Sequence, residues 1–303
     1  MPEAGPTDGM VRLPGGQFTM GADDQYPEEA PAHMVTVAPF RIDAHAVTNR
    51  QFAAFVAATG LVTLAEQTPR AQDYPLADPA LLFAGSLVFR RTPHPVPLDD
   101  PGRWWHWVKG ANWRAPQGPG SSIEGLDDHP VVQVAHADAA AYADWAGKTL
   151  PTEAQWEYAA RGGLEGQTYA WGPVFRPGGK AMANTWDGKF PSQRRGVFAA
   201  TSPVGSFPAN GFGLFDMIGN VWEWTDDWYQ PGHDKGPCCV ADNPRGPASG
   251  TTDPAAPIAQ KVLKGGSFLC SPSYCRRYRP AARHAESIDS ATNHIGFRCV
   301  LRG

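Results

Sequence analysis

The strongest indication of the fold lies in residues 210–224, which read NGFGLFDMIGNVWEW. Glycine and asparagine fill five of these fifteen positions, and both residue types favour turns over regular elements. The same bias extends over the whole chain, because 33 glycines and 30 prolines make up about a fifth of its 303 residues. That much turn chemistry argues against long helices or strands and predicts a fold rich in irregular loops.

A second segment, residues 265–283, reads GGSFLCSPSYCRRYRPAAR and carries the reactive side chains. Cys270 and Cys275 lie five positions apart, and four arginines follow within eight residues, whose positive charge can lower the pKa of a thiol. The spacing excludes a Cys-x-x-Cys redox motif, and no second cysteine pair completes the four ligands of a structural zinc. A disulfide, an ordinary pair of thiols and a two-coordinate site for a soft metal such as Cu(I) all remain open.

Charge and hydropathy argue against several classes of protein. The formal net charge is −4, which is no electrostatic basis for a nucleic-acid partner. No run approaches the roughly 18 apolar residues that a membrane span needs, and residues 1–9 lack the pattern of a secretory signal. We therefore expect no membrane association and a cytoplasmic location. Five cysteines, an odd number in a reducing compartment, argue against a framework of disulfides.

The hydrophobic pattern predicts few regular elements. Threonine N-caps, glycine stops and apolar periodicity indicate three helices, at about residues 49–59, 138–146 and 153–161. Short strands are expected near the N-terminus, and residues 164–303 should be almost all loop with short strands. We predict a flexible tail over residues 1–9 and a single domain over residues 10–303.

Residues 65–125 have weak periodicity and many prolines, which indicates a long insertion. Tryptophans concentrate in this region, at positions 104, 105, 107 and 113. Such residues more often anchor a loop to the core than line a substrate cleft, so we expect anchors here.

Three separated segments together resemble one family. They are residues 14–21, residues 150–157 and residues 210–224, and Gly296-Phe297-Arg298 closes the pattern. The chain is similar to the sulfatase-modifying-factor family from about residue 10 to residue 302. The resemblance implies a C-type-lectin-like α+β fold with little regular secondary structure and many loops. It does not imply one activity, because the same fold serves sulfoxide synthases, inactive paralogues and binding modules.

Residues 265–283 resemble the active-site segment of formylglycine-generating enzymes, whose cysteine pair the other branches of the family lack. The resemblance implies an enzyme that oxidises a cysteine of an unfolded sulfatase polypeptide to Cα-formylglycine, using Cu(I), dioxygen and a thiol reductant. It makes Cys270 and Cys275 the copper ligands. It also implies that Ser267 and Tyr274 lie near the bound oxygen and that Trp222 packs at the same pocket. Two soft thiolates without histidine agree with Cu(I).

The substrate motif of that family is Cys-x-Pro-x-Arg, which implies a cleft that accepts one cationic side chain. Arg283 matches a residue that contacts the substrate peptide, and His294 stands where the family more often has asparagine. A carboxylate should bind the substrate arginine, and Glu66, Asp127 and Asp128 are the candidates. Among the arginines of this segment, Arg276 and Arg277 are expected to be the most solvated.

The resemblance also implies structural calcium. Two carboxylates and two backbone carbonyls match the first calcium site of the family: Asp216, Gly219, Val221 and Glu223. Such hard oxygen ligands suit calcium. Asn184 and Thr185 match the first ligands of a second site, but Arg194-Arg195 stands where an acidic pair is usual. We therefore expect one calcium ion and not two.

The remaining cysteines have no role in this interpretation. Ala160 stands where secreted members carry the partner of Cys299, so Cys299 should be free, and Cys238 and Cys239 stay unassigned. The competing hypothesis is a non-catalytic peptide-binding paralogue of the same fold, against which the cysteine pair argues. An iron-dependent sulfoxide synthase would need three histidine ligands, and the nine histidines show no such spacing. We expect a monomer.

Overall fold

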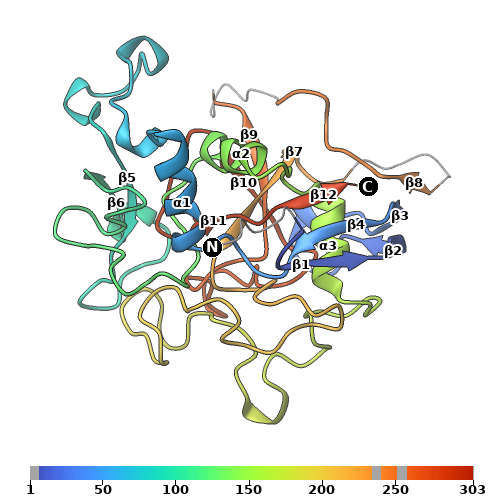
Figure 1. Cartoon of the computed structure of the whole chain (residues 1–303). Coiled ribbons are helices and arrows are strands. Elements are labelled where there is room, and N and C mark those ends of the chain that lie inside the picture. Colours follow the sequence, from blue (N-terminus) through green and yellow to red (C-terminus); the bar gives the residue numbers. More distant parts are fainter. Residues whose placement is uncertain (1–6, 234–239, 251–257, 303) are drawn as a thin grey trace.

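Short elements joined by long loops make up this fold (Figure 1). The computed structural model describes residues 7–233, 240–250 and 258–302. Within these residues there are three α-helices and twelve short strands, which confirms the α+β class with little regular structure. Cys238, Cys239 and most of the predicted tail lie outside the described residues.

The three α-helices are α1 (Asn49–Thr59), α2 (His136–Trp145) and α3 (Glu153–Arg161). Thr48 and Gln51 form a capping box at the start of α1, and Gly60 ends the helix in a left-handed conformation with φ of 69°. α2 begins two residues earlier than expected. Its third residue, Asp138, accepts a hydrogen bond of 2.9 Å from the backbone N–H of Ala135 and so fixes that start.

Four small sheets carry the strands. The central one has the order β10-β9-β7-β11, from Arg283–Ser287, Gln260–Lys264, Trp222–Trp228 and Ile295–Gly296. A second has the order β1-β4-β12, from Met10–Leu13, Phe40–Asp43 and Val300–Arg302. A third has the order β2-β3-β8, from Gly16–Met20, His33–Val37 and Ala241–Asp242. The fourth is the hairpin of β5 and β6, from Gly85–Phe89 and Trp105–Lys109.

The helix α3 is buried along its whole length and crosses between the sheets (Figure 1). Its apolar side packs with β2, β3 and β4 in one core cluster, in which Trp156 is fully buried. Large side chains of the β1-β4-β12 and β2-β3-β8 sheets are buried against this helix, which removes apolar surface from water. This burial is the main stabilising contribution, because the fold has few hydrogen-bonded elements.

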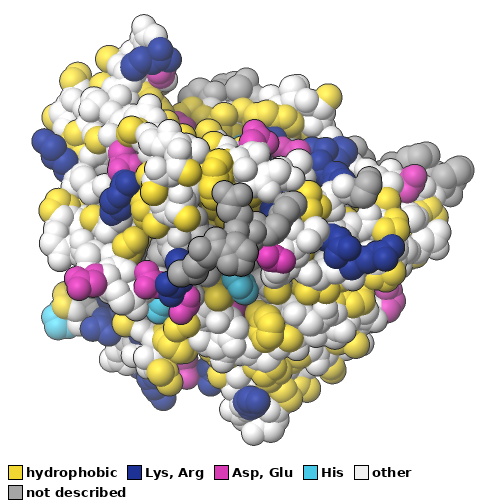
Figure 2. Space-filling model, viewed as in Figure 1, with side chains coloured by type: hydrophobic (Ala, Val, Ile, Leu, Met, Phe, Trp, Pro, Cys, Tyr) yellow, Lys and Arg dark blue, Asp and Glu magenta, His cyan; other side chains and the backbone are white. Residues whose placement is uncertain are grey.

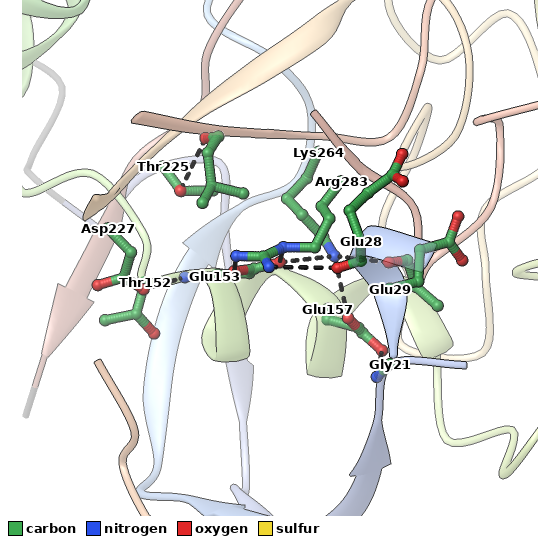
Figure 3. A network of polar contacts seen from close by, with 12 residues as sticks. Gly21, Glu28, Glu29, Thr152, Glu153, Glu157, Thr225, Asp227, Lys264 and Arg283 are labelled. Carbon is green, nitrogen blue, oxygen red and sulfur yellow. Dashed lines mark hydrogen bonds and ion pairs between the residues drawn. The ribbon is translucent and has the colours of Figure 1, made fainter. Parts of the chain in front are cut away.

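The polar side of α3 carries a buried network of charges (Figure 3). Lys264 Nζ lies 3.0 Å from Glu157 Oε2 and 3.3 Å from Glu153 Oε1. Arg283 binds both carboxylate oxygens of Glu153, at 2.9 and 2.8 Å, and Arg161 binds Glu157 at 2.6 Å. Burial alone would raise the pKa of Glu153, but the charges of Arg283 and Lys264 lower it to about 2.

The predicted insertion, residues 65–125, folds around the β5–β6 hairpin and several single-turn helices. Trp104 and Trp113 are buried, as expected of anchors, and Trp104 packs against Phe190. Trp107 is 38% exposed. Trp105 is half-buried: it packs on the same cluster of buried side chains as Trp104 and also lines a pocket, so it is both a loop anchor and a pocket residue.

The surface in Figure 2 shows lysine and arginine side chains scattered among acidic and hydrophobic ones, without one continuous basic area on this face. In the part of the chain that the structure describes, no helix has the length and apolar character to cross a membrane.

Candidate active site

A pocket of about 260 Å³ lies where the central sheet meets the loop after β9. Its walls come from distant parts of the chain: Trp105, Phe190, Trp222, Ser267, Leu269, Cys270, Tyr274, Cys275, Arg277, His284 and His294. The structure thus brings together six of the site residues that the family resemblance implies: Trp222, Ser267, Cys270, Tyr274, Cys275 and His294.

Two glycines allow the loop after β9 to reach this pocket. Gly265 and Gly266 have φ of 92° and 73°, a region that other residues rarely adopt. A Cβ atom on Gly266 would lie 2.8 Å from the carbonyl oxygen of Arg277, so the chain could not close here with a larger residue. The tight turn that follows is held by a hydrogen bond of 2.9 Å from the Cys270 N–H to the Ser267 carbonyl.

The two thiols lie side by side in this turn. The sulfur atoms of Cys270 and Cys275 are 3.1 Å apart, and both cysteines are free. Cys270 is 2% exposed, and its burial raises its pKa well above the ordinary value. Cys275 is half-buried, and the hydrogen bond from Cys270 together with the charge of Arg277 lowers its pKa to about 7. Near neutral pH, therefore, Cys275 carries the thiolate and Cys270 donates its proton to it.

Arg277, expected to be solvated, is instead half-buried beside the thiols. Its Nε donates to Glu28 Oε1 at 3.0 Å, Nη2 binds the same oxygen, and its guanidinium lies 3.9 Å from the centre of the Tyr26 ring. Both partners come from the N-terminal part of the chain. They hold the positive charge of Arg277 next to Cys275, whereas Arg276 is exposed, as predicted.

Ser267 and His294 form a polar contact at the pocket floor. Ser267 Oγ accepts the N–H of Leu269 at 3.2 Å and lies 3.4 Å from His294 Nδ1. Burial lowers the pKa of His294 to about 3, so its ring is neutral near pH 7. A neutral Nδ1 can accept the Ser267 hydroxyl proton. Trp105 meets the His294 ring edge to face, with centroids 4.8 Å apart.

Aromatic rings form the rest of the wall. Tyr274 stacks on Phe190 with centroids 4.5 Å apart and planes 4° apart, and Trp104 meets it edge to face. Burial raises the pKa of Tyr274, which keeps its hydroxyl protonated. Trp222 is buried, and His284 from β10 stacks on it at 5.7 Å. His284 was missed in the sequence, although it directly follows Arg283.

Arg283 itself does not line the pocket. Besides Glu153, its Nη1 donates to the backbone oxygens of Glu28, Gln230 and Gly232, at 3.2, 3.1 and 2.8 Å. The side chain is buried and its donors are used inside the fold (Figure 3), which contradicts a direct contact with substrate.

The three carboxylates considered for the substrate arginine lie elsewhere. Glu66 accepts hydrogen bonds from Thr63 and Arg114. Asp127 and Asp128 both face the exposed Arg50. None of the three lines the thiol pocket.

At the first expected calcium site, one of the two carboxylates has a free oxygen and the other does not. Asp216 Oδ2 accepts the N–H of Gly205 at 2.7 Å, whereas its Oδ1 is buried without a hydrogen-bond partner. Glu223 is also buried, but both of its oxygens accept from Arg298, at 2.7 and 2.8 Å, and Oε2 accepts from Trp156. The unpartnered oxygen of Asp216 is thus available to a cation, whereas Arg298 already engages both oxygens of Glu223.

No cluster of three or more histidine, cysteine, aspartate or glutamate side chains suited to a metal ion occurs in the described parts of the chain. Among the residues that the structure describes, the two cysteines therefore have no cluster of further such side chains around them. The protein is thus of the class in which a loop-rich α+β fold holds two adjacent free thiols in a pocket lined partly by aromatic rings.

Comparisons with known proteins agree with this class. Residues 1–302 match the profile of the sulfatase-modifying factor enzyme 1-like domain. The chain is 56% identical over 297 residues to a protein of Mycobacterium tuberculosis named formylglycine-generating enzyme, covering 96% of this chain and 97% of that one. It is 40% identical over 304 residues to a Mus musculus protein named inactive C-alpha-formylglycine-generating enzyme 2, with coverage of 96% and 85%.

Among solved structures, PvdO from Pseudomonas aeruginosa superimposes with a TM-score of 0.62 at 26% identity, over 96% of this chain and 93% of that one. These matches span nearly the whole chain. The protein therefore belongs to the sulfatase-modifying factor enzyme 1-like family.

Proposed function

We propose that this chain is a formylglycine-generating enzyme, which converts the cysteine of a Cys-x-Pro-x-Arg motif in an extended sulfatase segment to Cα-formylglycine. Its similarity to a formylglycine-generating enzyme over almost all of both chains supports this function. The observation that carries it is the pair of free thiols, Cys270 and Cys275, with sulfurs 3.1 Å apart in an open pocket.

The same pair fits Cu(I) as the cofactor. Two thiol sulfurs that lie side by side are soft ligands, and a site of two thiolates without a third protein ligand suits Cu(I) better than zinc or iron. Cys270 and Cys275 would hold the ion. Bound copper would supply affinity for the thiolate of the substrate and one-electron chemistry with dioxygen.

Arg277 makes the thiol pair ready to bind a cation. Its positive charge stabilises the Cys275 thiolate and, with the hydrogen bond from Cys270, holds the pKa of this thiol below the ordinary value. The salt bridge to Glu28 keeps Arg277 in this place before any ligand arrives. Less free energy is therefore needed to deprotonate the pair on binding.

The remaining pocket residues position and protect the reacting groups. Tyr274 presents its hydroxyl beside the thiols, where it can donate a hydrogen bond to an oxygen species, and Ser267 can do the same when its O–H turns away from His294. His294 Nδ1 contacts the Ser267 oxygen and so fixes the position of this side chain. The rings of Trp105, Phe190 and Trp222 give the pocket apolar walls that exclude water from the substrate cysteine.

Each turnover of the proposed reaction needs one dioxygen and two thiol reductants. The substrate sulfur leaves as hydrogen sulfide, and one oxygen atom becomes the aldehyde oxygen. The second oxygen atom leaves as water, and the two reductant thiols leave as a disulfide. The partners are thus an unfolded sulfatase polypeptide, dioxygen and a thiol. Monomeric state, cytoplasmic location and a single bound calcium remain predictions.

Peptide mass spectrometry tests this function. Copper-loaded protein is incubated with a Cys-x-Pro-x-Arg peptide, dioxygen and dithiothreitol, and the expected result is a mass loss of about 18 Da, because hydrogen sulfide is lost and one oxygen gained. Cys270→Ser and Cys275→Ser should each abolish the loss. Cys299→Ala is the matched control, since Cys299 is free but lies in the core outside the pocket.

Two outcomes would contradict the proposal. Conversion that survives Cys270→Ser and Cys275→Ser would place the chemistry elsewhere. Peptide binding by the wild-type protein without any conversion would favour the non-catalytic peptide-binding paralogue; the 40% identical mouse relative is named an inactive enzyme.

A further inference from the structure

A half-buried arginine occupies the region in which the family resemblance implies a second calcium ion. Arg194 Nη2 donates to Asn184 Oδ1 at 2.8 Å, and its Nε donates to the carbonyl oxygen of Phe198 at 2.9 Å. Its Nη1 donates to the carbonyl oxygen of Phe268. One side-chain amide and two backbone carbonyls converge here on one positive charge. Amide and backbone carbonyl oxygens are also ligands that calcium prefers in proteins.

The surroundings enclose this guanidinium. Its Cζ lies 5.3 Å from the centre of the Trp186 ring and 5.4 Å from that of Phe268, so aromatic faces flank the cation. Burial lowers the pKa of Arg194 to about 10, which still leaves the group charged at neutral pH. Asp187, whose charge opposes this shift, pairs with Arg176.

A metal ion does not fit beside this side chain. Calcium needs six to eight oxygen ligands, and the oxygens of Asn184, Phe198 and Phe268 already accept from Arg194. A divalent ion among them would also face a fixed positive charge at close range without a carboxylate between them. We infer that the guanidinium of Arg194 is the resident cation of this site and that the wild-type chain binds no metal ion there.

The arginine thereby fixes the backbone next to the thiol pocket. Asn184 also accepts the N–H of Asn220 on its backbone oxygen at 2.8 Å, and Asn220 accepts the N–H of Phe268 at 2.9 Å. Two residues after Asn184, the N–H of Trp186 donates to the carbonyl of Cys270 at 2.9 Å. Arg194 is therefore a positioning residue for the turn that carries Cys270.

Substitution by an acid tests whether the site is a cation site whose cation is Arg194. In Arg194→Asp, a carboxylate joins the three freed oxygens, and we expect isothermal titration with calcium to show one more bound ion per chain than in the wild type. The melting temperature of this variant should rise with calcium and fall with a chelator, and both changes should exceed those of the wild type. Arg195→Asp is the matched control, because Arg195 is exposed and the change in charge is the same.

A second variant covers a failure of Arg194→Asp to fold. Arg194→Gln removes the charge, keeps most of the volume, and should lower the melting temperature by about 5 °C, with partial recovery in calcium. In the absence of calcium, Arg194→Lys should have a higher melting temperature than Arg194→Gln. Arg195→Gln should change neither value. Calcium that the wild type binds and Arg194→Asp or Arg194→Gln loses would overturn the inference, as would equal melting temperatures in Arg194→Gln and Arg195→Gln.

These readouts are metal stoichiometry and stability. They fail or succeed independently of the enzymatic function proposed above.

Discussion

Two arginines six positions apart, Arg277 and Arg283, meet opposite environments. Arg283 uses its donors on Glu153 and on three backbone oxygens, inside a network in which each buried charge has a partner. Arg277 also has a carboxylate partner, Glu28, but a second face of it lies against a pocket that holds an ionisable thiol. The same residue type is structural in one place and sets chemistry in the other.

Both side chains are charged, so it is the hydrogen-bonding capacity left over after folding that separates the two roles. A buried ion pair with all donors satisfied contributes to the uniqueness of the fold and has nothing left for a ligand. A half-buried cation with one partner can still act on a neighbouring group through its field. Substitutions in the two regions should therefore change different observables.

The largest effect is expected at the buried pair. Arg283→Met leaves Glu153 without its main partner, and breaking a buried pair in this way costs about 3–5 kcal/mol. Urea unfolding followed by tryptophan fluorescence should show this loss of unfolding free energy. Arg276→Met is the control, since Arg276 is exposed, and it should stay within about 0.5 kcal/mol of the wild type. An equal loss in both variants would remove the distinction between the regions.

Acid should unfold the protein through the same network. The pKa values of Glu153 and Glu157 fall from an ordinary 4.5 to about 2 in the folded state. Because the unfolded state binds protons first, the stability from these carboxylates is complete above about pH 4.5 and is lost as the pH falls toward 2. Circular dichroism between pH 6 and 2 should show it. Glu157→Gln should flatten this dependence, and an unchanged slope would contradict the assignment.

Removal of the pocket arginine should change reactivity more than stability. In Arg277→Gln, the Cys275 thiolate loses its nearby positive charge, and its pKa should rise from about 7 toward the ordinary thiol value. If the pKa rises by about one unit, alkylation by iodoacetamide at pH 7 slows about fivefold. The pH profile of alkylation measures this rise directly. A profile unchanged from the wild type would show that Arg277 does not control the thiol.

The smallest effect is expected at the rim of the pocket. Trp105→Ala removes one aromatic wall beside His294, and the KM for the peptide should increase roughly fivefold, the equivalent of about 1 kcal/mol of aromatic contact. The stability should change little, because Trp105 is only half-buried. Trp107→Ala is the neighbouring control, and it should leave KM unchanged. Equal effects of the two would argue against Trp105 as a pocket residue.

Local signals in the sequence predicted the elements well. The caps Thr48 and Thr152 and the stops Gly60 and Gly162 lie where the structure begins and ends two of the helices. Family motifs placed the thiol turn and its serine and tyrosine in one pocket. These features depend on residues close together in the chain, so a sequence pattern can contain them.

Partners far apart in the chain could not be predicted in this way. Glu28 lies 249 positions from Arg277, and Glu153 lies 130 positions from Arg283. Nothing in the sequence near either arginine indicates which of the two has its hydrogen-bond donors bound inside the fold. For the same reason the sequence does not show that Trp105 lines the pocket, because only the folded hairpin places it against His294.

The two-residue strand β11 has a consequence for the order of folding. It pairs in parallel with β7, with Ile295 opposite Trp222, and this contact places His294 beside the thiol turn. Contacts between segments so distant in the chain form late, because the entropy of closing long loops must be overcome first. The acidity of Cys275 depends on Arg277, which Glu28 holds from the N-terminal end. Cys275 therefore becomes a reactive thiolate only in the fully folded chain. In partly folded molecules it remains an ordinary thiol that reacts slowly.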